Sequence, residues 1–262
     1  MKHRATGFVP VLVLALAALP LLASAQDDAS SAPPDGWSGT GELGFALSRG
    51  NARSENLNAR LAFARETERW KHDWYATAMR AKGEATGDFD GDGVEETRYD
   101  LSANRYELGA ASGYKFDDRN YLIASGRYEN DDFAPFEYQA TLAISYGRRI
   151  IDGERTRLLA EVGPGYRRAR DADTGVVDSQ AILRGLFDFS HRLTDNTVLG
   201  NRLLVEAGSD NTFAQNDLGV AVAMNEAFAL KAGLQLRHNT EVGAGTKKTD
   251  TLTTVNLVYS FL

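Results

Sequence analysis

The chain has 262 residues, of which 43% are hydrophobic and 25% charged, and it contains no cysteine, so disulfides and thiol chemistry are excluded. The formal net charge is −7, which argues against nucleic acid as a partner. Glycine is abundant (25) and proline scarce (6), as is typical of closely packed strands that keep their hydrogen-bond donors.

The N-terminus has the pattern of an export signal. A basic head at residues 2–4 precedes an apolar run from Phe8 to Leu22, and an Ala-Ser-Ala cleavage pattern ends at Ala25. We therefore expect residues 1–25 to be a signal peptide and the polar stretch 26–36 to be a flexible periplasmic tether. The apolar run is too short to favour a retained membrane anchor. Because the signal carries two of the 29 basic residues and none of the 36 acidic ones, the mature chain has a net charge of −9.

The rest of the chain, from residue 37 to residue 262, alternates between apolar and polar residues with a period of two. This period predicts β-strands, and no stretch has a convincing amphipathic helical pattern. We predict about twelve strands, near residues 37–48, 54–66, 70–82, 98–116, 119–129, 136–149, 156–169, 177–191, 197–207, 213–224, 227–240 and 248–262.

The predicted connections alternate between short turns and longer loops. The short set lies near residues 67–69, 117–118, 152–154, 194–196 and 225–226. The second set, mostly longer and richer in Gly, Asp and Asn, lies near residues 49–53, 83–97, 130–135, 170–176, 208–212 and 241–247. Outer-membrane barrels have short periplasmic turns and longer outer loops, and an even strand number places both termini in the periplasm. The sequence therefore predicts an all-β, antiparallel, up-and-down transmembrane barrel.

The last predicted strand, from Thr249 to Leu262, has one apolar face that includes Val255, Leu257, Tyr259 and Phe261. We expect this face to contact lipid and the strand to close the barrel by pairing with residues 37–48. Aromatic residues at strand ends, such as Trp37, Trp70 and Trp74, fit the girdles of a membrane barrel, although buried core aromatics occur at strand ends too.

Charged residues of both signs recur on the opposite strand faces, which we expect to line a polar lumen. These candidate lumen residues are Glu42, Arg60, Arg105, Glu107, Glu161, Arg167, Arg184, Asp188, Arg202, Glu206, Lys231, Arg237 and Asp250. Such a lining either forms ion pairs across the lumen or holds water in a narrow pore, and the sequence does not choose between them.

Two other classes of protein are compatible with parts of the pattern. An exported soluble β-sandwich that binds a ligand would show the same alternation, but the long strands, the loop rhythm and the aromatic last strand favour the barrel. A barrel hydrolase would need a histidine near the outer end, where His238 is expected, with Asp250 across the hairpin. Because no nucleophile motif accompanies His238, we predict a protein without catalytic residues.

Several short motifs, in this order and spacing, resemble the YdiY-like family of salt-induced outer-membrane proteins. They are Trp37-Ser-Gly-Thr-Gly-Glu-Leu-Gly44 with Gly50-Asn51, Tyr128-Glu129 with Asp132-Phe133, Gly163-Pro-Gly-Tyr166, and Lys248-Thr-Asp-Thr251 with Tyr259-Ser-Phe261. The resemblance covers residues 37–262. It implies an outer-membrane barrel of unknown function, links it to salt stress and carries over no catalytic residues.

The predicted loop 83–97 contains a possible calcium site. Asp88, Asp90 and Asp92, followed by Gly93, match the first half of a calcium-binding loop. The last ligand position of an EF-hand would be Tyr99 instead of glutamate, so the full EF-hand is excluded. A solvated acidic loop is the alternative to a simpler calcium site, and we expect no other cofactor.

Taken together, these patterns predict a barrel in the outer membrane of a Gram-negative bacterium. Its partners would be outer-membrane lipid and, during assembly, periplasmic chaperones and the barrel-assembly machinery. Two functions remain open, a narrow pore for small solutes and a structural barrel that supports the envelope under salt or osmotic stress. Twelve strands give an interior between those of small packed barrels and open porins, so size does not decide.

Overall fold

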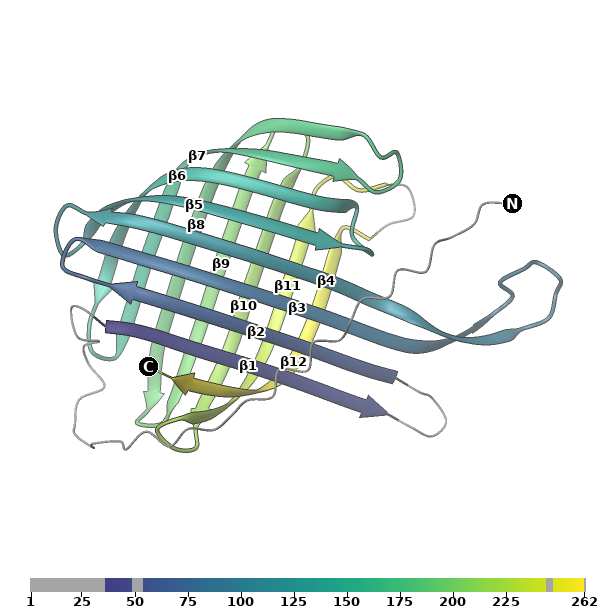
Figure 1. The fold of residues 1–262 in the computed structure, drawn as a ribbon, viewed down its shortest axis with the longest axis horizontal. Helices are drawn as coiled ribbons and strands as arrows, with labels where there is room; N and C mark the ends of the chain where they lie inside the picture. The colour runs from purple at the N-terminus through teal and green to yellow at the C-terminus, as the bar shows by residue number, and fades with distance from the viewer. Residues whose placement is uncertain (1–35, 49–53, 244–246, 262) are drawn as a thin grey trace. The chain divides into compact units, whose positions relative to one another are not determined.

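A computed structural model describes residues 36–48, 54–243 and 247–261 of the chain. Twelve antiparallel strands form one closed barrel, in which each strand pairs with the next and β1 pairs with β12 (Figure 1). The predicted all-β barrel of about twelve strands is therefore confirmed. The strands are β1 (Gly36–Ser48), β2 (Ser54–Glu66), β3 (Trp70–Gly87), β4 (Glu96–Lys115), β5 (Asn120–Asp131), β6 (Phe136–Asp152), β7 (Thr156–Asp171), β8 (Val177–Thr194), β9 (Thr197–Gly208), β10 (Thr212–Ala223), β11 (Phe228–Asn239) and β12 (Thr249–Phe261).

The expected signal peptide at residues 1–25 lies outside the described residues, and so does the expected tether except for Gly36, which begins β1. The described residues contain no helix long and apolar enough to cross a membrane.

The first and last strands close the sheet. Five residue pairs join β1 to β12, from Gly39 opposite Phe261 to Leu43 opposite Leu257. Closure removes the two sheet edges, which a membrane strand cannot leave unpaired because lipid offers no hydrogen bonds. The same pairing rules out the β-sandwich alternative, since the chain forms one closed sheet instead of two facing sheets.

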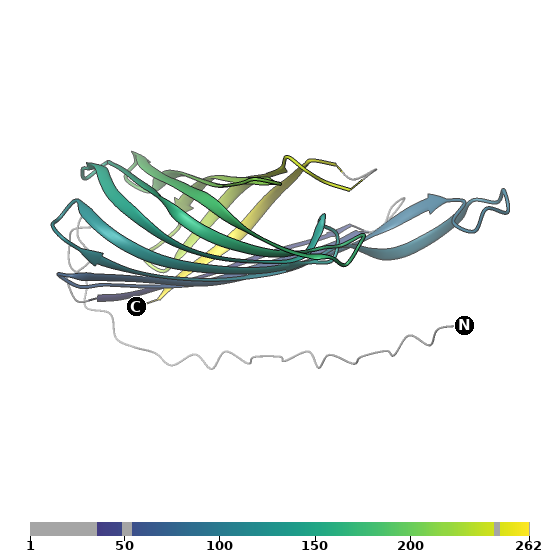
Figure 2. The same ribbon diagram turned by 90° about the horizontal axis from the view of Figure 1, so that it is seen from above.

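One hairpin is longer than the sequence pattern predicts. We expected a loop at residues 83–97, but β3 continues to Gly87 and β4 begins at Glu96, so the two strands form a projecting ribbon (Figures 1 and 2). The register shifts between Ala81 and Lys82. This irregularity interrupts the period of two, and the strand beyond it therefore reads as a loop in the sequence.

The short turns and the longer connections lie at opposite ends of the barrel, as their alternation along the chain predicts. The turn end carries the connections 67–69, 116–119, 153–155, 195–196 and 224–227, whereas the loop end carries the described connections 88–95, 132–135, 172–176 and 209–211. Because short turns are periplasmic in outer-membrane barrels, we call the loop end of this barrel its outer end.

Aromatic residues gather on the outer wall near both ends. At the turn end, the ring of His72 stacks between those of Trp70 and Trp74, with centroid distances of 5.9 and 5.6 Å. Toward the loop end, Tyr128 contacts Tyr106 at 6.1 Å and Tyr138 on its other side at 6.2 Å. These two groups occupy the positions of the interfacial girdles in a transmembrane barrel.

Between the girdles the outer wall is apolar. Leu142 is 69% exposed and Val255 is 61% exposed, and both belong to the outward faces of their strands. Large exposed apolar side chains over a whole wall would aggregate in water, but they match a lipid environment. The polar side chains of the same strands point inward. The lumen is therefore the place to look for a functional site.

Candidate functional site

The lumen contains a group of charged residues that join strands on opposite sides of the barrel. We call Glu107, Arg127, Glu129, Glu206 and Arg237 the lumen brace. Alternation along β4, β5, β9 and β11 turns these five side chains inward, and each is at most 9% exposed. Arg127 and Glu129 lie close to the outer end of β5, and Glu206 and Arg237 lie close to the outer ends of β9 and β11. The brace therefore occupies the outer half of the lumen.

Arg127 is the centre of the lumen brace. Its Nη1 lies 3.1 Å from Oε2 of Glu129 and 3.7 Å from Oε2 of Glu107, and its Nη2 lies 3.1 Å from Oε2 of Glu206. Because β5 and β9 are not neighbours in the sheet, the pair of Arg127 with Glu206 spans the lumen. One buried guanidinium thus contacts three buried carboxylates, so loss of Arg127 would take a charge partner from all three.

Arg237 adds a second link across the lumen, from β11 to β5. Its Nη2 lies 2.5 Å from Oε1 of Glu129, and its Nη1 lies 3.3 Å from Oδ2 of Asp131. The ring of Phe213 contacts both guanidinium groups, with its centroid 4.8 Å from Cζ of Arg127 and 5.2 Å from Cζ of Arg237. Phe213 is 0% exposed. Ion pairs and two cation–π contacts therefore link the walls of the lumen at this level.

The loop after β9 is bonded to inward side chains of two other strands. The backbone carbonyl of Asn211 accepts a hydrogen bond of 2.7 Å from Nη2 of Arg167, and its amide donates one of 2.8 Å to Asn239. Its side-chain oxygen accepts one of 3.1 Å from the backbone N–H of Glu241. Asn211 is buried, so these contacts fix the loop after β9 to β7 and β11.

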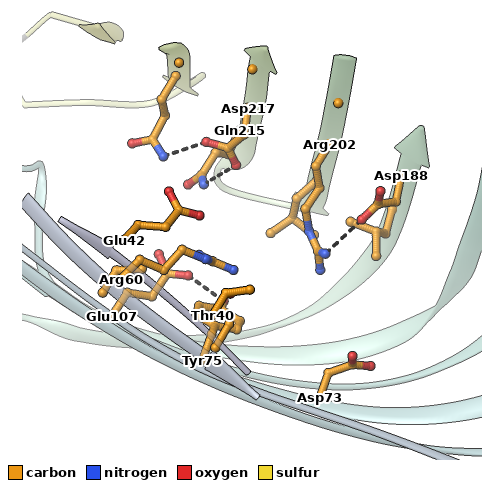
Figure 3. A pocket seen from close by; sticks show the side chains of 18 of the residues that line it. Thr40, Glu42, Arg60, Asp73, Tyr75, Glu107, Asp188, Arg202, Gln215 and Asp217 are labelled. Carbon is orange, nitrogen blue, oxygen red and sulfur yellow. Dashed lines mark hydrogen bonds and ion pairs between the residues drawn. The ribbon is translucent and has the colours of Figure 1, made fainter. Parts of the chain in front are cut away.

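From the lumen brace toward the turn end, the lumen contains a chamber of about 690 Å³, and Glu107, Arg127 and Glu206 of the brace belong to its lining (Figure 3). Arg60 points into this chamber, with its Cζ 4.8 Å from the centroid of the Tyr75 ring. On the far wall, Nη1 of Arg202 lies 3.0 Å from Oδ2 of Asp188. Both of these side chains are more than a third exposed, in contrast to the brace. The chamber is therefore solvated.

The structure places the thirteen predicted lumen residues on inward faces of the strands. Ten of them line the chamber: Glu42, Arg60, Arg105, Glu107, Glu161, Arg184, Asp188, Arg202, Glu206 and Lys231. Arg167 and Arg237 are buried nearer the outer mouth, and Asp250 lies opposite Arg237 in the pairing of β11 with β12. Many of these residues form ion pairs, for example Glu42 with Lys231 at 2.8 Å and Glu161 with Arg184 at 3.1 Å.

The sequence pattern missed two of the five charges of the brace. Arg127, Glu129 and Asp131 were not among the predicted lumen residues, and neither was Phe213. On β5 both faces carry apolar residues near the turn end, because Tyr121 and Ile123 point inward, so the alternation is weak there. The spacing of two residues between the three charges is the signal that could have identified them.

The possible pairing of His238 with Asp250 is wrong. Both strands alternate with a period of two, so His238 faces outward and its Nδ1 lies 2.8 Å from Oγ1 of Thr249, whereas Asp250 pairs in register with Arg237 on the inner face. The other two described histidines contact aromatic rings or a hydroxyl group. His72 stacks on tryptophans, and Nδ1 of His191 lies 2.8 Å from Oγ1 of Thr156.

The acidic loop at the tip of the projecting ribbon brings its three aspartates together. Carboxylate oxygens of Asp88, Asp90 and Asp92 lie within 4.8 Å of one another. Asp88 accepts hydrogen bonds from the backbone N–H groups of Gly93 and Gly91, and these bonds hold the pKa of its carboxyl below the usual range. Gly91 and Gly93 have φ angles of 80° and 84°, which side chains rarely adopt. The loop thus presents charged oxygens on a turn that depends on glycine.

Calcium is expected to protect this loop from proteolysis, because converging carboxylates would coordinate the ion and stiffen the turn. The measurement is limited digestion of the folded barrel in calcium and in chelator, with cleavage between residues 83 and 97 followed by mass spectrometry. The variant Asp88→Asn/Asp90→Asn should lose the difference. Identical digestion of the unaltered protein in both conditions would contradict the calcium site.

The closed sheet, apolar outer wall, two aromatic girdles and charged lumen define a β-barrel of the outer membrane. The chain belongs to the family described as "Protein of unknown function, DUF481", whose model matches residues 41–261.

Known proteins similar to the chain include one curated relative and several solved barrels. The "Uncharacterized protein YdiY" of Escherichia coli (strain K12) is 26% identical over 238 residues, which are 90% of this chain and 86% of that protein. The COG4313 outer membrane channel from Pseudomonas putida F1 is 11% identical with a TM-score of 0.48, covering 91% of this chain and 99% of that one. The translocator domain of the autotransporter NalP from Neisseria meningitidis is 14% identical with a TM-score of 0.47, covering 86% and 87%. The NanC porin is 8% identical with a TM-score of 0.46, covering 86% and 98%.

Proposed function

We propose that the protein is a structural barrel of the outer membrane, with a lumen that is closed in its outer half, and not a permanently open pore. The observation that carries the proposal is the lumen brace. The pair of Arg127 with Glu206 crosses the lumen between strands that are not neighbours, and Arg237 joins a third side of the wall to Glu129. Buried ion pairs between distant strands resist changes in the shape of the barrel, which supports a role in bracing the envelope.

The charge distribution of the chamber also supports a structural role. Porins that select by charge carry an excess of one sign along the path of the ion. Here seven basic residues (Arg60, Lys71, Arg105, Arg127, Arg184, Arg202 and Lys231) and seven acidic residues (Glu42, Asp73, Glu107, Glu161, Asp188, Glu206 and Asp217) line the chamber. This balance favours ion pairing within the wall over attraction of a charged solute.

A narrow pore is the second candidate, and the chamber of about 690 Å³ favours it. Such a pore would need the lumen brace to open.

The proposed structural role extends to salt or osmotic stress through the family resemblance. We also propose that the signal peptide 1–25 directs export and is cleaved after Ala25. Periplasmic chaperones would then deliver the chain, and the barrel-assembly machinery would insert it. The proposed role involves no catalytic step.

The two candidates differ in planar-bilayer conductance. The folded, unaltered barrel is expected to be silent, because the brace and Phe213 link the walls of the lumen. The variant Arg127→Ala/Glu206→Ala removes both members of the central pair without leaving an unpaired partner in that pair, and it is expected to conduct in steps. Conducting steps from this variant would also show that the barrel inserts into the bilayer, so that silence of the unaltered barrel is informative. Reproducible steps from the unaltered protein would overturn the structural proposal in favour of the pore.

A further inference from the structure

Two asparagines on the lipid-facing wall of the barrel form a hydrogen-bonded pair. Asn201 of β9 donates from Nδ2 to Oδ1 of Asn216 on β10, and Asn216 donates back to Asn201, both at 3.1 Å. The neighbouring side chains of Arg202 and Asp217 point into the lumen, where Arg202 pairs with Asp188 and Asp217 accepts a hydrogen bond from Gln235. The alternation of the strands therefore turns the two asparagine side chains outward, and only the neighbouring main chain borders the chamber.

The pair lies near the middle of the membrane-spanning wall. Asn201 is four residues from Thr197, the turn-end residue of β9, and seven from Gly208 at the other end. Asn216 is four residues from the loop end of β10 and seven from its turn end. Across the hairpin, Asn201 is opposite Leu218 and Asn216 is opposite Leu203. The two amides therefore have apolar neighbours in register and lie at least four residues from either end of their strands.

The reciprocal bonds satisfy half of the hydrogen-bonding capacity of each amide. An asparagine side chain has two N–H donors and an oxygen with two lone pairs. Each asparagine uses one donor and one lone pair in the pair, and each is half-buried. Because these side chains are on the outer wall, the remaining N–H and lone pair have only hydrocarbon on the membrane side, and hydrocarbon cannot hydrogen-bond with them. Another protein surface that offers a hydrogen-bond acceptor and a donor at this depth would satisfy the remaining N–H and lone pair.

We infer that the outer face of β9 and β10 is the interface between two copies of this chain, centred on Asn201 and Asn216. A two-fold axis along the membrane normal places the same patch on both sides of an interface. Each copy then offers one free donor and one free acceptor from each amide to an identical set on the other copy. Polar side chains that hydrogen-bond across otherwise apolar surfaces are a recurrent means of association in membranes. The pair is thus complementary to itself, which favours a second copy over an unrelated partner.

Cysteine cross-linking tests the interface directly, because the chain contains no cysteine of its own. In the full-length protein in its native membrane, Leu218→Cys is expected to form a disulfide-linked dimer on mild oxidation, since Leu218 lies beside Asn201 and is 40% exposed. The matched control is Leu142→Cys on the outer face of β6, which is 69% exposed and should remain monomeric. Equal cross-linking of the two variants, or none at Leu218→Cys, would overturn the interface.

The role of the amides is tested by adding Asn201→Leu/Asn216→Leu to the Leu218→Cys chain. The dimer fraction is expected to fall at least tenfold, while the shift in gel migration between heated and unheated samples shows that the barrel still folds. Unchanged cross-linking in this folded variant would contradict the assignment. A second measurement does not depend on variants: native mass spectrometry of the unaltered protein in a mild detergent should give a mass of two chains, and a mass of one chain would overturn the inference.

Discussion

Replacing Arg127 with methionine is expected to lower the free energy of unfolding by about 3–5 kcal/mol, the usual cost of leaving buried charges without their partner. Methionine keeps most of the side-chain length but removes the charge that faces Glu107, Glu129 and Glu206. Of these, Glu129 keeps a contact with Arg237, whereas Glu206 has no other ion pair among the described residues. The measurement is equilibrium unfolding in urea of the barrel in lipid vesicles, followed by tryptophan fluorescence.

The control for this prediction is Arg98→Met on the projecting ribbon. Arg98 lies 2.7 Å from Glu96, and both side chains are exposed to water. Exposed ion pairs contribute about 1 kcal/mol or less, so this variant should unfold close to the unaltered protein. Similar losses in Arg127→Met and Arg98→Met would show that the lumen brace does not stabilise the barrel.

Replacing Gly163 with alanine is expected to destabilise the barrel by about 3 kcal/mol, at the upper end of the usual cost of overpacking. A Cβ atom at Gly163 would lie 2.0 Å from the carbonyl oxygen of Ile144 and 2.5 Å from Cα of Ser145, both of which are main-chain atoms of β6. The main chain cannot move aside without disturbing the pairing of β6 with β7. Urea unfolding and the yield of heat-modifiable protein in the outer membrane measure the effect.

Gly185 on β8 is the matched control. A Cβ atom built there meets nothing within 4 Å, so Gly185→Ala should assemble and unfold like the unaltered protein. If Gly163→Ala behaves in the same way, the close approach of β6 to β7 is not a constraint on the fold. The result also bears on the motif Gly163-Pro-Gly-Tyr166, because it supplies a steric reason for its first glycine.

The period-two pattern of the strands and the alternation of short turns with longer loops were sufficient to predict the barrel. Period-two alternation depends on residues within one strand, so the outward positions of Leu257 and Tyr259 can be derived from the sequence. The closing contact of β12 with β1 follows from the requirement that a membrane sheet has no free edge. The alternation failed where a local irregularity interrupts it, as between Ala81 and Lys82, and the ribbon beyond that point was therefore predicted as a loop.

The partners of the inward charges could not be derived in the same way. Arg127 and Glu206 are 79 residues apart and belong to strands that do not pair. Which charges meet across a lumen depends on the tilt of the strands and on the stagger of their register around the whole barrel. Neither quantity is encoded in the pattern of a single strand, so the sequence left both a water-filled pore and an ion-paired interior open.

By itself, the sequence determined that this protein forms a membrane barrel of about twelve strands, with polar residues inside and aromatic residues near the strand ends. Those features follow from local alternation and turn composition. The tertiary structure alone decided that buried ion pairs cross the outer half of the lumen, that a solvated chamber extends from them toward the turn end, and that two asparagines meet on the lipid-facing wall. These features require closure of the barrel and a particular register, because they join side chains that the chain order keeps on separate strands.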